Sequence, residues 1–186
     1  MRVISGSARG AHLKSIESYE TRPTTDRIKE NMFNLIQHVI PGKIVLDLFS
    51  GSGALAVEAL SRGAAEAVLV ENSKKCYTVI TENLLKTRVG TRARVVTTDV
   101  EQALIDLTKK GKRFDLILMD PPYSKGYILP VLEQIEALEI LTSDGYIMIE
   151  HESSDSLPEV LGRLVRVKHR AYGRTSLSLY REEETS

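Results

Sequence analysis

The sequence predicts an α/β fold: a seven-stranded, mostly parallel sheet with helices on both faces and a C-terminal antiparallel hairpin. Two observations lead to this expectation. From residue 43 onward, apolar runs of strand length alternate with segments of helical periodicity, which is typical of βα units. Near the C-terminus, two apolar runs instead flank the polar turn 171–174, which predicts antiparallel strands.

The elements are expected in the following order. Strand 44–48 precedes helix 54–62, which Gly63 ends, and strand 67–70 precedes a helix that Ser73 caps and that extends to Lys86. Strands 93–96 and 114–119 enclose helix 100–109, and helix 129–138 leads through the turn Asp144-Gly145 to strand 146–149. The hairpin strands are 164–167 and 177–180. Right-handed crossovers place the carboxyl ends of the parallel strands at one edge of the sheet, where ligands bind.

The N-terminal residues do not show this alternation of strands and helices. Apolar residues on either side of the segment 6–10 predict a hairpin with a loose loop. A threonine before Asp26 is a suitable cap for a helix whose apolar positions recur at helical spacing until Pro41 ends it. We therefore divide the chain into an extension, residues 1–41, and a domain, residues 42–186.

Composition restricts the classes of function. Lys plus Arg and Asp plus Glu each number 25, so attraction to nucleic acid has to come from local clusters of charge. The single cysteine, Cys76, supports neither an internal disulfide nor a cysteine-based zinc site, and it fits a reducing compartment. The apolar runs are too short to span a membrane, and residues 1–6 lack the apolar core of a signal peptide. We expect a cytoplasmic protein with no membrane or metal partner.

A glycine-containing loop follows the first strand of the domain. Residues 47–56, DLFSGSGALA, match the pattern G-x-G-x-x-A, which by itself is a weak signal for dinucleotide binding. Gly51 and Gly53 let the backbone turn tightly and approach a ligand closely. Asp47 would repel a pyrophosphate, but it suits a cationic ligand such as the amino-acid end of S-adenosylmethionine.

Two further carboxylates follow the next two strands. Glu71 ends strand 67–70, where a carboxylate can accept both hydroxyls of a ribose. Asp99 follows strand 93–96, where it can receive the amino group of an adenine. Either residue alone could equally be a helix cap beside a solvated loop. Carboxylates at three consecutive strand ends together favour a cationic nucleoside ligand.

Asp120-Pro121-Pro122-Tyr123 is the most specific string in the chain. The two prolines remove two backbone donors and stiffen the loop, which leaves their carbonyls as fixed acceptors. Together with the Asp120 carboxylate, these carbonyls can grip an exocyclic NH₂ group and orient its nitrogen. Tyr123 offers an aromatic face on which an unstacked base can lie.

With these motifs the chain resembles S-adenosylmethionine-dependent amino-methyltransferases, and over residues 2–123 it is similar to one family, the RsmD-type methyltransferases. The string Thr21-Arg-Pro-Thr-Thr-Asp-Arg27 is specific to that family, whereas the glycine loop and Asp-Pro-Pro-Tyr are shared more widely. The resemblance implies a Rossmann-like class I methyltransferase fold. It further implies methylation of guanine N2 in small-subunit (16S) rRNA, with S-adenosyl-L-methionine as cofactor and rRNA or the assembling small subunit as partner.

The predicted site has three groups of residues. Those expected to bind the cofactor are Asp47, Phe49, Gly51, Gly53, Glu71, Asn72, Asp99 and Val100. Those expected at the reacting group are Asp120, Pro121, Pro122 and Tyr123. Those expected to contact RNA are Arg9, Arg22, Thr24 and Arg27, and a second cluster of bases in residues 162–181 is either a phosphate-facing rim or a solvated face.

Other functions fit parts of the same pattern. Asp-Pro-Pro-Tyr also suits adenine N6 or another exocyclic amine in DNA, RNA or protein, since each of these presents an NH₂ group. G-x-G-x-x-A with Glu71 also fits a nicotinamide-dependent oxidoreductase, although no residue set for hydride transfer accompanies it. A non-catalytic nucleic-acid-binding module is a further alternative, and it predicts that Asp120 can be replaced without loss.

Overall fold

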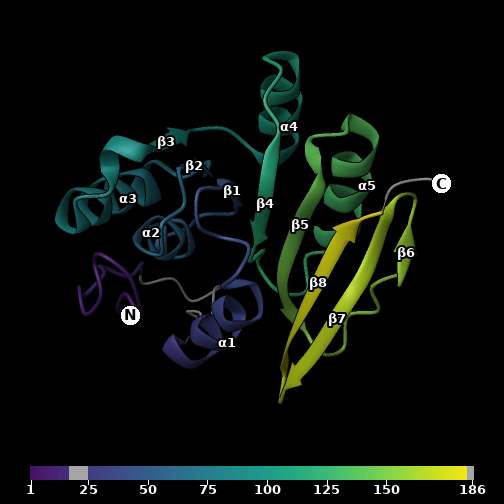
Figure 1. Ribbon diagram of the computed structural model, residues 1–186, viewed down its shortest axis with the longest axis horizontal. Helices are drawn as coiled ribbons and strands as arrows, with labels where there is room; N and C mark the ends of the chain where they lie inside the picture. The colour runs from purple at the N-terminus through teal and green to yellow at the C-terminus, as the bar shows by residue number, and fades with distance from the viewer. Residues whose placement is uncertain (17–24, 184–186) are drawn as a thin grey trace.

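A single sheet runs through the protein. The computed structural model describes residues 1–16 and 25–183, and in these ranges the strand order is β3-β2-β1-β4-β5-β8-β7-β6 (Figure 1). The strands are β1 (Ile44–Leu48), β2 (Glu66–Val70), β3 (Ala93–Val96), β4 (Phe114–Met119), β5 (Leu141–Glu152), β6 (Val160–Leu161), β7 (Leu164–Tyr172) and β8 (Thr175–Glu182). Strands β1 to β5 are parallel, and β8, β7 and β6 continue the sheet in antiparallel pairs. The predicted α/β fold is therefore confirmed.

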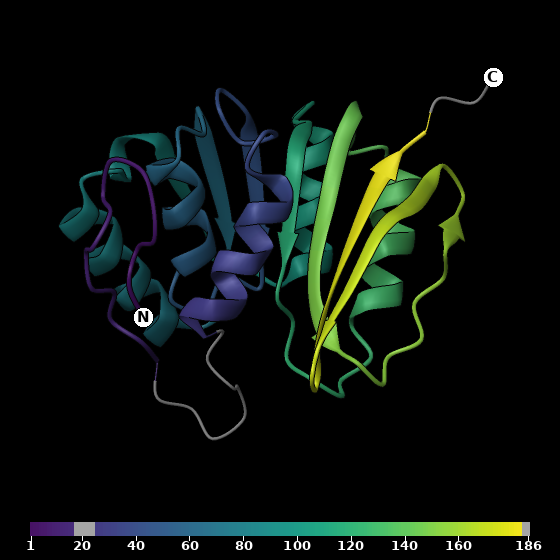
Figure 2. The same cartoon turned by 60° about the horizontal axis from the view of Figure 1, so that its bottom comes forward.

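Helices cover both faces of this sheet. They are α1 (Asp26–Ile36), α2 (Ala54–Ser61), α3 (Lys74–Thr87), α4 (Val100–Lys109) and α5 (Ile128–Leu138), with the 3-10 turn η1 (Gly90–Arg92) before β3. Helices α1, α2 and α3 share one apolar core with one face of the sheet, and α4 and α5 share a second core with the other face. Figure 2 shows both layers, with α1 in front and α5 behind the strands.

Strand β1 shows why the sequence forms two layers. Side chains alternate between the faces of a strand, so Val45 belongs to the first core and Leu46 to the second. Both faces are buried, which explains why the strand reads as an almost continuous apolar run. Asp47 is the one polar residue in this run, and it lies on the face that α1 and α2 cover. Its contacts come from the residues that follow the strand.

The differences from the predicted elements lie mainly at the C-terminus. Strand β5 begins at Leu141 and reaches Glu152, well beyond the expected 146–149. The short strand β6 was not expected, and the β7–β8 turn is tightened to Gly173 and Arg174. Polar residues such as Ser176 and Ser178 are fully buried in β8, so the apolar pattern underestimated the length of these strands.

The N-terminal hairpin is only partly regular. One antiparallel bridge joins Arg2 to His12, and the backbone of Val3 pairs with that of Ala11. Val3 is buried in the same core as α1 and α2. The N-terminal residues thus pack onto the domain, while the functional division at residue 41 stays a prediction.

Candidate active site

The glycine loop folds tightly between β1 and α2. Three residues in it have left-handed backbone conformations: Phe49 (φ 59°), Gly51 (φ 55°) and Gly53 (φ 77°). A Cβ atom on Gly53 would lie 3.2 Å from a side-chain methyl of Leu69 and 3.3 Å from Ile80. Gly53 is therefore required both for its conformation and for close packing of the loop on the sheet. It does not line a cavity, so its predicted part in cofactor binding would be indirect.

Asp47 lies beneath this loop and is almost fully buried. Its Oδ2 accepts a hydrogen bond from the Ala56 amide at 3.2 Å, and among the described residues its Oδ1 is the one buried side-chain polar atom without a partner. Burial, with a smaller contribution from the negative charges of Asp120 and Glu71, raises the pKa of Asp47 to about 8. An unpartnered carboxyl surrounded by other acids is a site that a positive charge would stabilise.

Glu71 and Asp99 lie at the ends of their strands, as predicted. The two carboxylate oxygens of Glu71 accept hydrogen bonds from the backbone amides of Gly51 and Ser73, each at 2.9 Å. Glu71 thereby fixes the glycine loop, and each oxygen keeps a further lone pair for a ligand. Asp99 caps α4 by accepting from the Gln102 amide at 2.9 Å. It is a helix cap and a cavity residue at the same time.

A cavity of about 770 Å³ opens at the carboxyl edge of the parallel strands. Its volume lies within the usual range for small-molecule sites. The predicted cofactor residues on its wall are Phe49, Gly51, Glu71, Asn72, Asp99 and Val100, and Asp120 and Pro122 join them from the end of β4. The sheet therefore brings six of the eight predicted cofactor residues to one cavity, whereas Asp47 and Gly53 lie behind its wall.

The cavity also has wall residues that the sequence did not reveal. Tyr127 lies 5.6 Å from Phe49 between ring centroids, and the two tilted rings stand together at the wall. Cys76 also contributes to the wall, and burial raises the pKa of its thiol. Tyr127 comes shortly after Tyr123 in the sequence, so its position close to Asp-Pro-Pro-Tyr could have indicated that it belongs to the site.

The Asp-Pro-Pro-Tyr loop separates this cavity from a smaller one. Asp120 directly follows β4 and is half-buried, and the next residue, Pro121, is buried. The Tyr123 hydroxyl donates to Glu150 Oε1 at 3.1 Å and lies 3.0 Å from the hydroxyl oxygen of Thr175. Burial raises the pKa of Tyr123 far above its ordinary value, so the phenol stays protonated and serves as an anchor for the ring.

The smaller cavity, of about 120 Å³, lies over this loop. Asp120 to Tyr123 form one wall, and the glycine loop forms another. Met1, Ser15 and Ile16 complete it from the N-terminal segment. Phe49, Gly51, Asp120 and Pro122 line both cavities, so a group held in the larger one has access to the face of Asp-Pro-Pro-Tyr.

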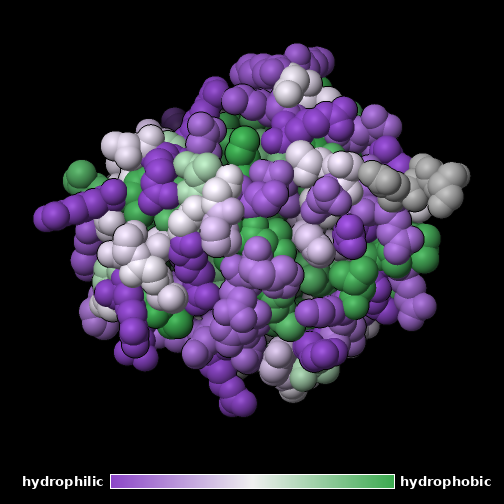
Figure 3. Space-filling model, in the orientation of Figure 1, coloured by the Kyte–Doolittle hydropathy of each residue, from purple (hydrophilic) through white to green (hydrophobic). Residues whose placement is uncertain are grey.

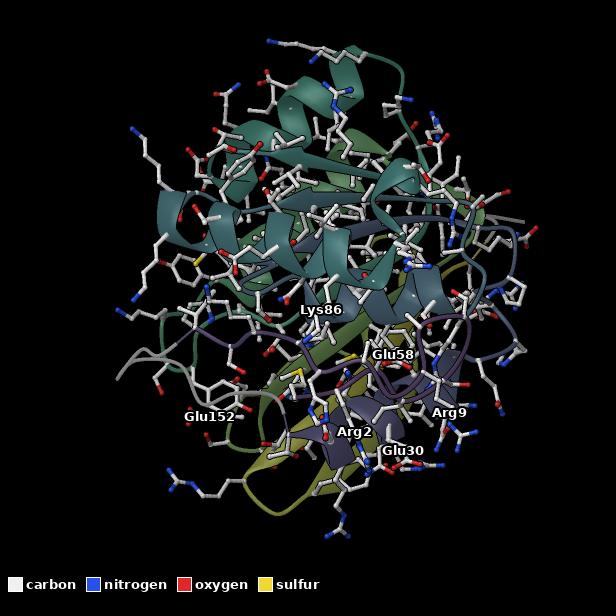
Figure 4. All side chains as sticks on the ribbon, turned by 90° about the vertical axis from the view of Figure 1, so that its left-hand side faces the viewer. Arg2, Arg9, Glu30, Glu58, Lys86 and Glu152 are labelled. Atoms are coloured by element: carbon white, nitrogen blue, oxygen red, sulfur yellow. The ribbon has the colours of Figure 1, made fainter. Side chains whose placement is uncertain are left out.

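Of the four predicted RNA-contact residues, the structure describes Arg9 and Arg27. Arg22 and Thr24 lie outside the described residues, and Arg27 is exposed in the first turn of α1. Arg9 belongs to a loop that packs on the C-terminal end of α2, where the Ser7 amide donates to the Ser61 carbonyl at 2.8 Å. In Figure 4, Arg9 and Glu152, which ends β5, lie at opposite sides of the molecule. The structure thus places Arg9 away from the edge that carries Asp120.

Over residues 1–16 and 25–183, no three His, Cys, Asp or Glu side chains come together as a metal site would require. Over the same part of the chain, each helix is too short or too polar to cross a membrane.

The sheet order, the glycine loop after β1 and the antiparallel β8–β7 extension define the Rossmann-like fold of class I methyltransferases. The chain belongs to the family described as conserved hypothetical protein 95, whose model matches residues 1–181, and the resemblance to the RsmD-type family is thereby confirmed.

Known relatives match nearly the whole chain. It is 34% identical to ribosomal RNA small subunit methyltransferase D of Escherichia coli, over 98% of this chain and 90% of that protein. It is 39% identical to YlbH of Bacillus subtilis, for which an rRNA methyltransferase activity has been proposed, over 98% and 99%. A solved Escherichia coli structure, the proposed methyltransferase yhhF, superposes with a TM-score of 0.86 at 33% identity, over 98% of each chain.

A more distant structure, SMU.776, shares the fold at 17% identity with a TM-score of 0.67. The match covers 82% of this chain and 48% of that one, and SMU.776 was solved in complex with SAH.

Proposed function

We propose that this protein is an S-adenosylmethionine-dependent RNA methyltransferase that methylates the exocyclic N2 of a guanine in small-subunit (16S) rRNA. One observation carries the proposal. Asp120-Pro-Pro-Tyr stands between an acid-lined cavity of cofactor size and a smaller cavity that opens onto an aromatic ring. The names of the full-length relatives support the rRNA substrate.

The larger cavity suits S-adenosylmethionine chemically. Glu71 and Asp99 would hold its ribose and adenine, and the acids around Asp47 would balance its positive charge. When bound, the cofactor supplies an electrophilic methyl group on a sulfonium. The unpartnered Oδ1 of Asp47 is the observation that favours a cation over a pyrophosphate.

Asp120 and Pro121 would orient the amine that accepts the methyl group. An aromatic NH₂ is a poor nucleophile because its lone pair is delocalised into the ring. Hydrogen bonds from its two protons to the Asp120 carboxylate and the Pro121 carbonyl would favour a more tetrahedral nitrogen. Positioning of this kind is the main requirement for the reaction. After transfer, one amine proton leaves to Asp120 or to water.

Tyr123 would hold the target base by stacking. Its hydroxyl is fixed between β5 and β8, so the ring is presented in one orientation. Base–aromatic stacking contributes about 1–3 kcal/mol, which favours a base that has left its own stack. The high pKa of Tyr123 excludes the phenolate as a base at ordinary pH.

The RNA would approach from the side of α1. Arg27 is exposed in its first turn, and we assign Arg22 and Thr24 to the same contact on the family resemblance. Arg9 would reach only a part of the substrate distant from the target base. A folded rRNA, or the assembling small subunit in the cytoplasm, presents enough surface for both contacts.

Methyl transfer from radiolabelled S-adenosylmethionine to purified rRNA and to small ribosomal subunits tests the proposal. Wild-type protein should label one of them, and Asp120→Ala should label neither while it still binds the cofactor in a calorimetric titration. Mass analysis of the digested RNA should identify N2-methylguanosine. N6-methyladenosine would replace the proposed target, and cofactor binding without any labelled RNA would contradict an RNA substrate.

A further inference from the structure

The structure divides the basic residues near the C-terminus into two sets. One set forms ion pairs: Arg163 with Glu136, Glu139 and Glu182, Arg166 with Glu159, and Arg181 with Asp144. The other set consists of Lys168, Arg170 and Arg174, which form no ion pair with any residue in the described ranges 1–16 and 25–183. We call these three the hairpin cations. All three are exposed, so their charge is available to a partner.

Two hairpin cations lie on the same face of the sheet as α1. Lys168 pairs with Leu179 and Arg170 with Leu177 across β7 and β8, and directly paired residues share a face. Leu177 and Leu179 belong to the core beneath α1 and α2, which identifies that face. Figure 2 shows that no helix covers β7 there, because α5 lies on the far side.

The third cation directly precedes a residue that contacts the Asp-Pro-Pro-Tyr loop. Arg174 directly precedes Thr175, whose hydroxyl lies 3.0 Å from that of Tyr123. The turn is held rigidly, because the Ser153 amide donates to the Arg174 carbonyl at 2.9 Å and the Ser153 hydroxyl donates to the Gly173 carbonyl at 2.9 Å. A phosphate bound by Arg174 would therefore lie beside the nucleotide that stacks on Tyr123.

The acids of this face do not neutralise the hairpin cations. Glu150 is buried and receives the Tyr123 hydroxyl, and Glu152 accepts from the Ser124 hydroxyl at 2.8 Å. Glu152 forms no ion pair with Lys168 or Arg170 in the described part of the structure.

We propose that the hairpin cations form a phosphate-contact surface that holds the ribose-phosphate backbone flanking the target nucleotide. This inference rests on the proposed function. A nucleic-acid backbone is the favoured partner because it presents repeated phosphates, which Lys and Arg neutralise with release of counterions. Figure 3 shows that hydrophilic side chains cover most of the visible face and that apolar groups occur only in small patches, which disfavours an apolar protein partner.

The test compares two triple variants. The hairpin variant replaces Lys168, Arg170 and Arg174 with glutamine. The control variant replaces Lys109, Lys110 and Lys112 with glutamine; these residues are also exposed, but they lie at the end of α4 and in the loop before β4. Affinity for an rRNA transcript is measured by fluorescence anisotropy at several salt concentrations, cofactor affinity by calorimetry, and kcat and KM by methyl transfer.

The hairpin variant should bind the transcript roughly tenfold to hundredfold more weakly near physiological salt, with a shallower salt dependence. Its KM for RNA should rise, while its kcat and its cofactor affinity stay unchanged. The control variant should match the wild type. If the wild type is active and the hairpin variant binds RNA as tightly as the wild type, the inference is overturned. The same holds if the control variant loses as much RNA affinity as the hairpin variant. Neither result affects the proposed function. A wild type that methylates no RNA overturns the proposed function and this inference with it.

Discussion

At the scale of single residues, Tyr123 is defined by how its hydroxyl is held. The phenol lies between Glu150 of β5 and Thr175 of β8, so the Asp-Pro-Pro-Tyr loop is tied to the antiparallel part of the sheet. Without these contacts, a loop stiffened by two prolines would still leave the tyrosine ring free to rotate. The hydrogen bonds convert a flexible aromatic side chain into an oriented platform.

Two variants separate this anchoring from stacking. Tyr123→Phe keeps the ring and removes the hydroxyl, so we expect kcat/KM for RNA to fall roughly tenfold or less because the stacking face remains. Tyr123→Ala removes the ring, and a loss of about 1–3 kcal/mol corresponds to a fall in kcat/KM of roughly fivefold to 160-fold. Steady-state methyl transfer measures both. A larger loss in Tyr123→Phe than in Tyr123→Ala would contradict a stacking role.

Asp47 gives a prediction about pH. Its pKa is about 8 in the folded protein, against an ordinary value of 3.8, so the folded state retains a proton that the unfolded state releases. The free energy of unfolding should therefore fall as the pH rises from about 4 to about 8. In Asp47→Asn this contribution is absent, and its stability should change less over the same interval. Urea unfolding at pH 5, 7 and 9 provides the measurement, and parallel curves for the two proteins would refute the assignment.

At the scale of elements, Glu58 joins three parts of the chain. From α2, its carboxylate accepts the amides of Ile4 and Ser5 at 2.9 and 3.0 Å and pairs with Arg62 at 2.8 Å and with Lys29 of α1 at 3.2 Å. The Lys29 and Glu58 side chains are both fully buried. Burial lowers the pKa of Lys29, and Glu58 partly offsets this shift. One acid thus positions the N-terminal segment that lines the smaller cavity, and Figure 4 shows Glu58 between α2 and the segment that carries Arg2.

Removing this acid should destabilise the fold strongly. Glu58→Gln leaves Lys29 buried without its counter-charge, and loss of one partner of a buried ion pair costs about 3–5 kcal/mol. The double variant Lys29→Met with Glu58→Gln should recover part of that loss, because it buries no charge. Urea unfolding of both variants at neutral pH compares them. The role of the buried Glu58–Lys29 pair would be contradicted by a single variant whose free energy of unfolding lies within about 1 kcal/mol of the wild type. It would also be contradicted by a double variant that is less stable than the single one.

The elements that the sequence predicted are those whose cause is local. The parallel strands and the helices of the domain follow from apolar periodicity, and Glu71 and Asp99 follow from their places at strand ends. The end of strand β5 was underestimated because Glu150 and His151 are buried polar groups, which contact the Tyr123 hydroxyl and Ser178 of β8. Arg9 was grouped with the RNA-contact residues on local charge and on the family resemblance, and the packing of its loop on α2 places it away from Asp120.

At the scale of the whole molecule, the carboxyl edge of the sheet collects residues that are far apart in the chain. The two cavities draw on segments from Met1 to Val131, and the hydroxyl of Thr175 supports Tyr123 from behind. The net charge is zero, yet four acids line the larger cavity, whereas Lys168 and Arg170 lie in β7, farther along the sheet. A ligand in the larger cavity therefore contacts loops from four parallel strands and should stabilise the domain as a unit.

This coupling is measurable as a thermal shift. A ligand that binds only the folded state stabilises it by about 2.7 kcal/mol at a concentration one hundred times its Kd. For a domain of this size, the corresponding rise in Tm is roughly 5–10 °C. S-adenosylhomocysteine should produce this shift in differential scanning fluorimetry, and Glu71→Gln should reduce it because the ribose loses an acceptor. NADH at the same concentration should leave Tm unchanged, because its negatively charged pyrophosphate would be repelled by the acids that line the cavity. If NADH raises Tm and S-adenosylhomocysteine does not, the result would favour the oxidoreductase alternative. It would contradict the assignment of this cavity to S-adenosylmethionine.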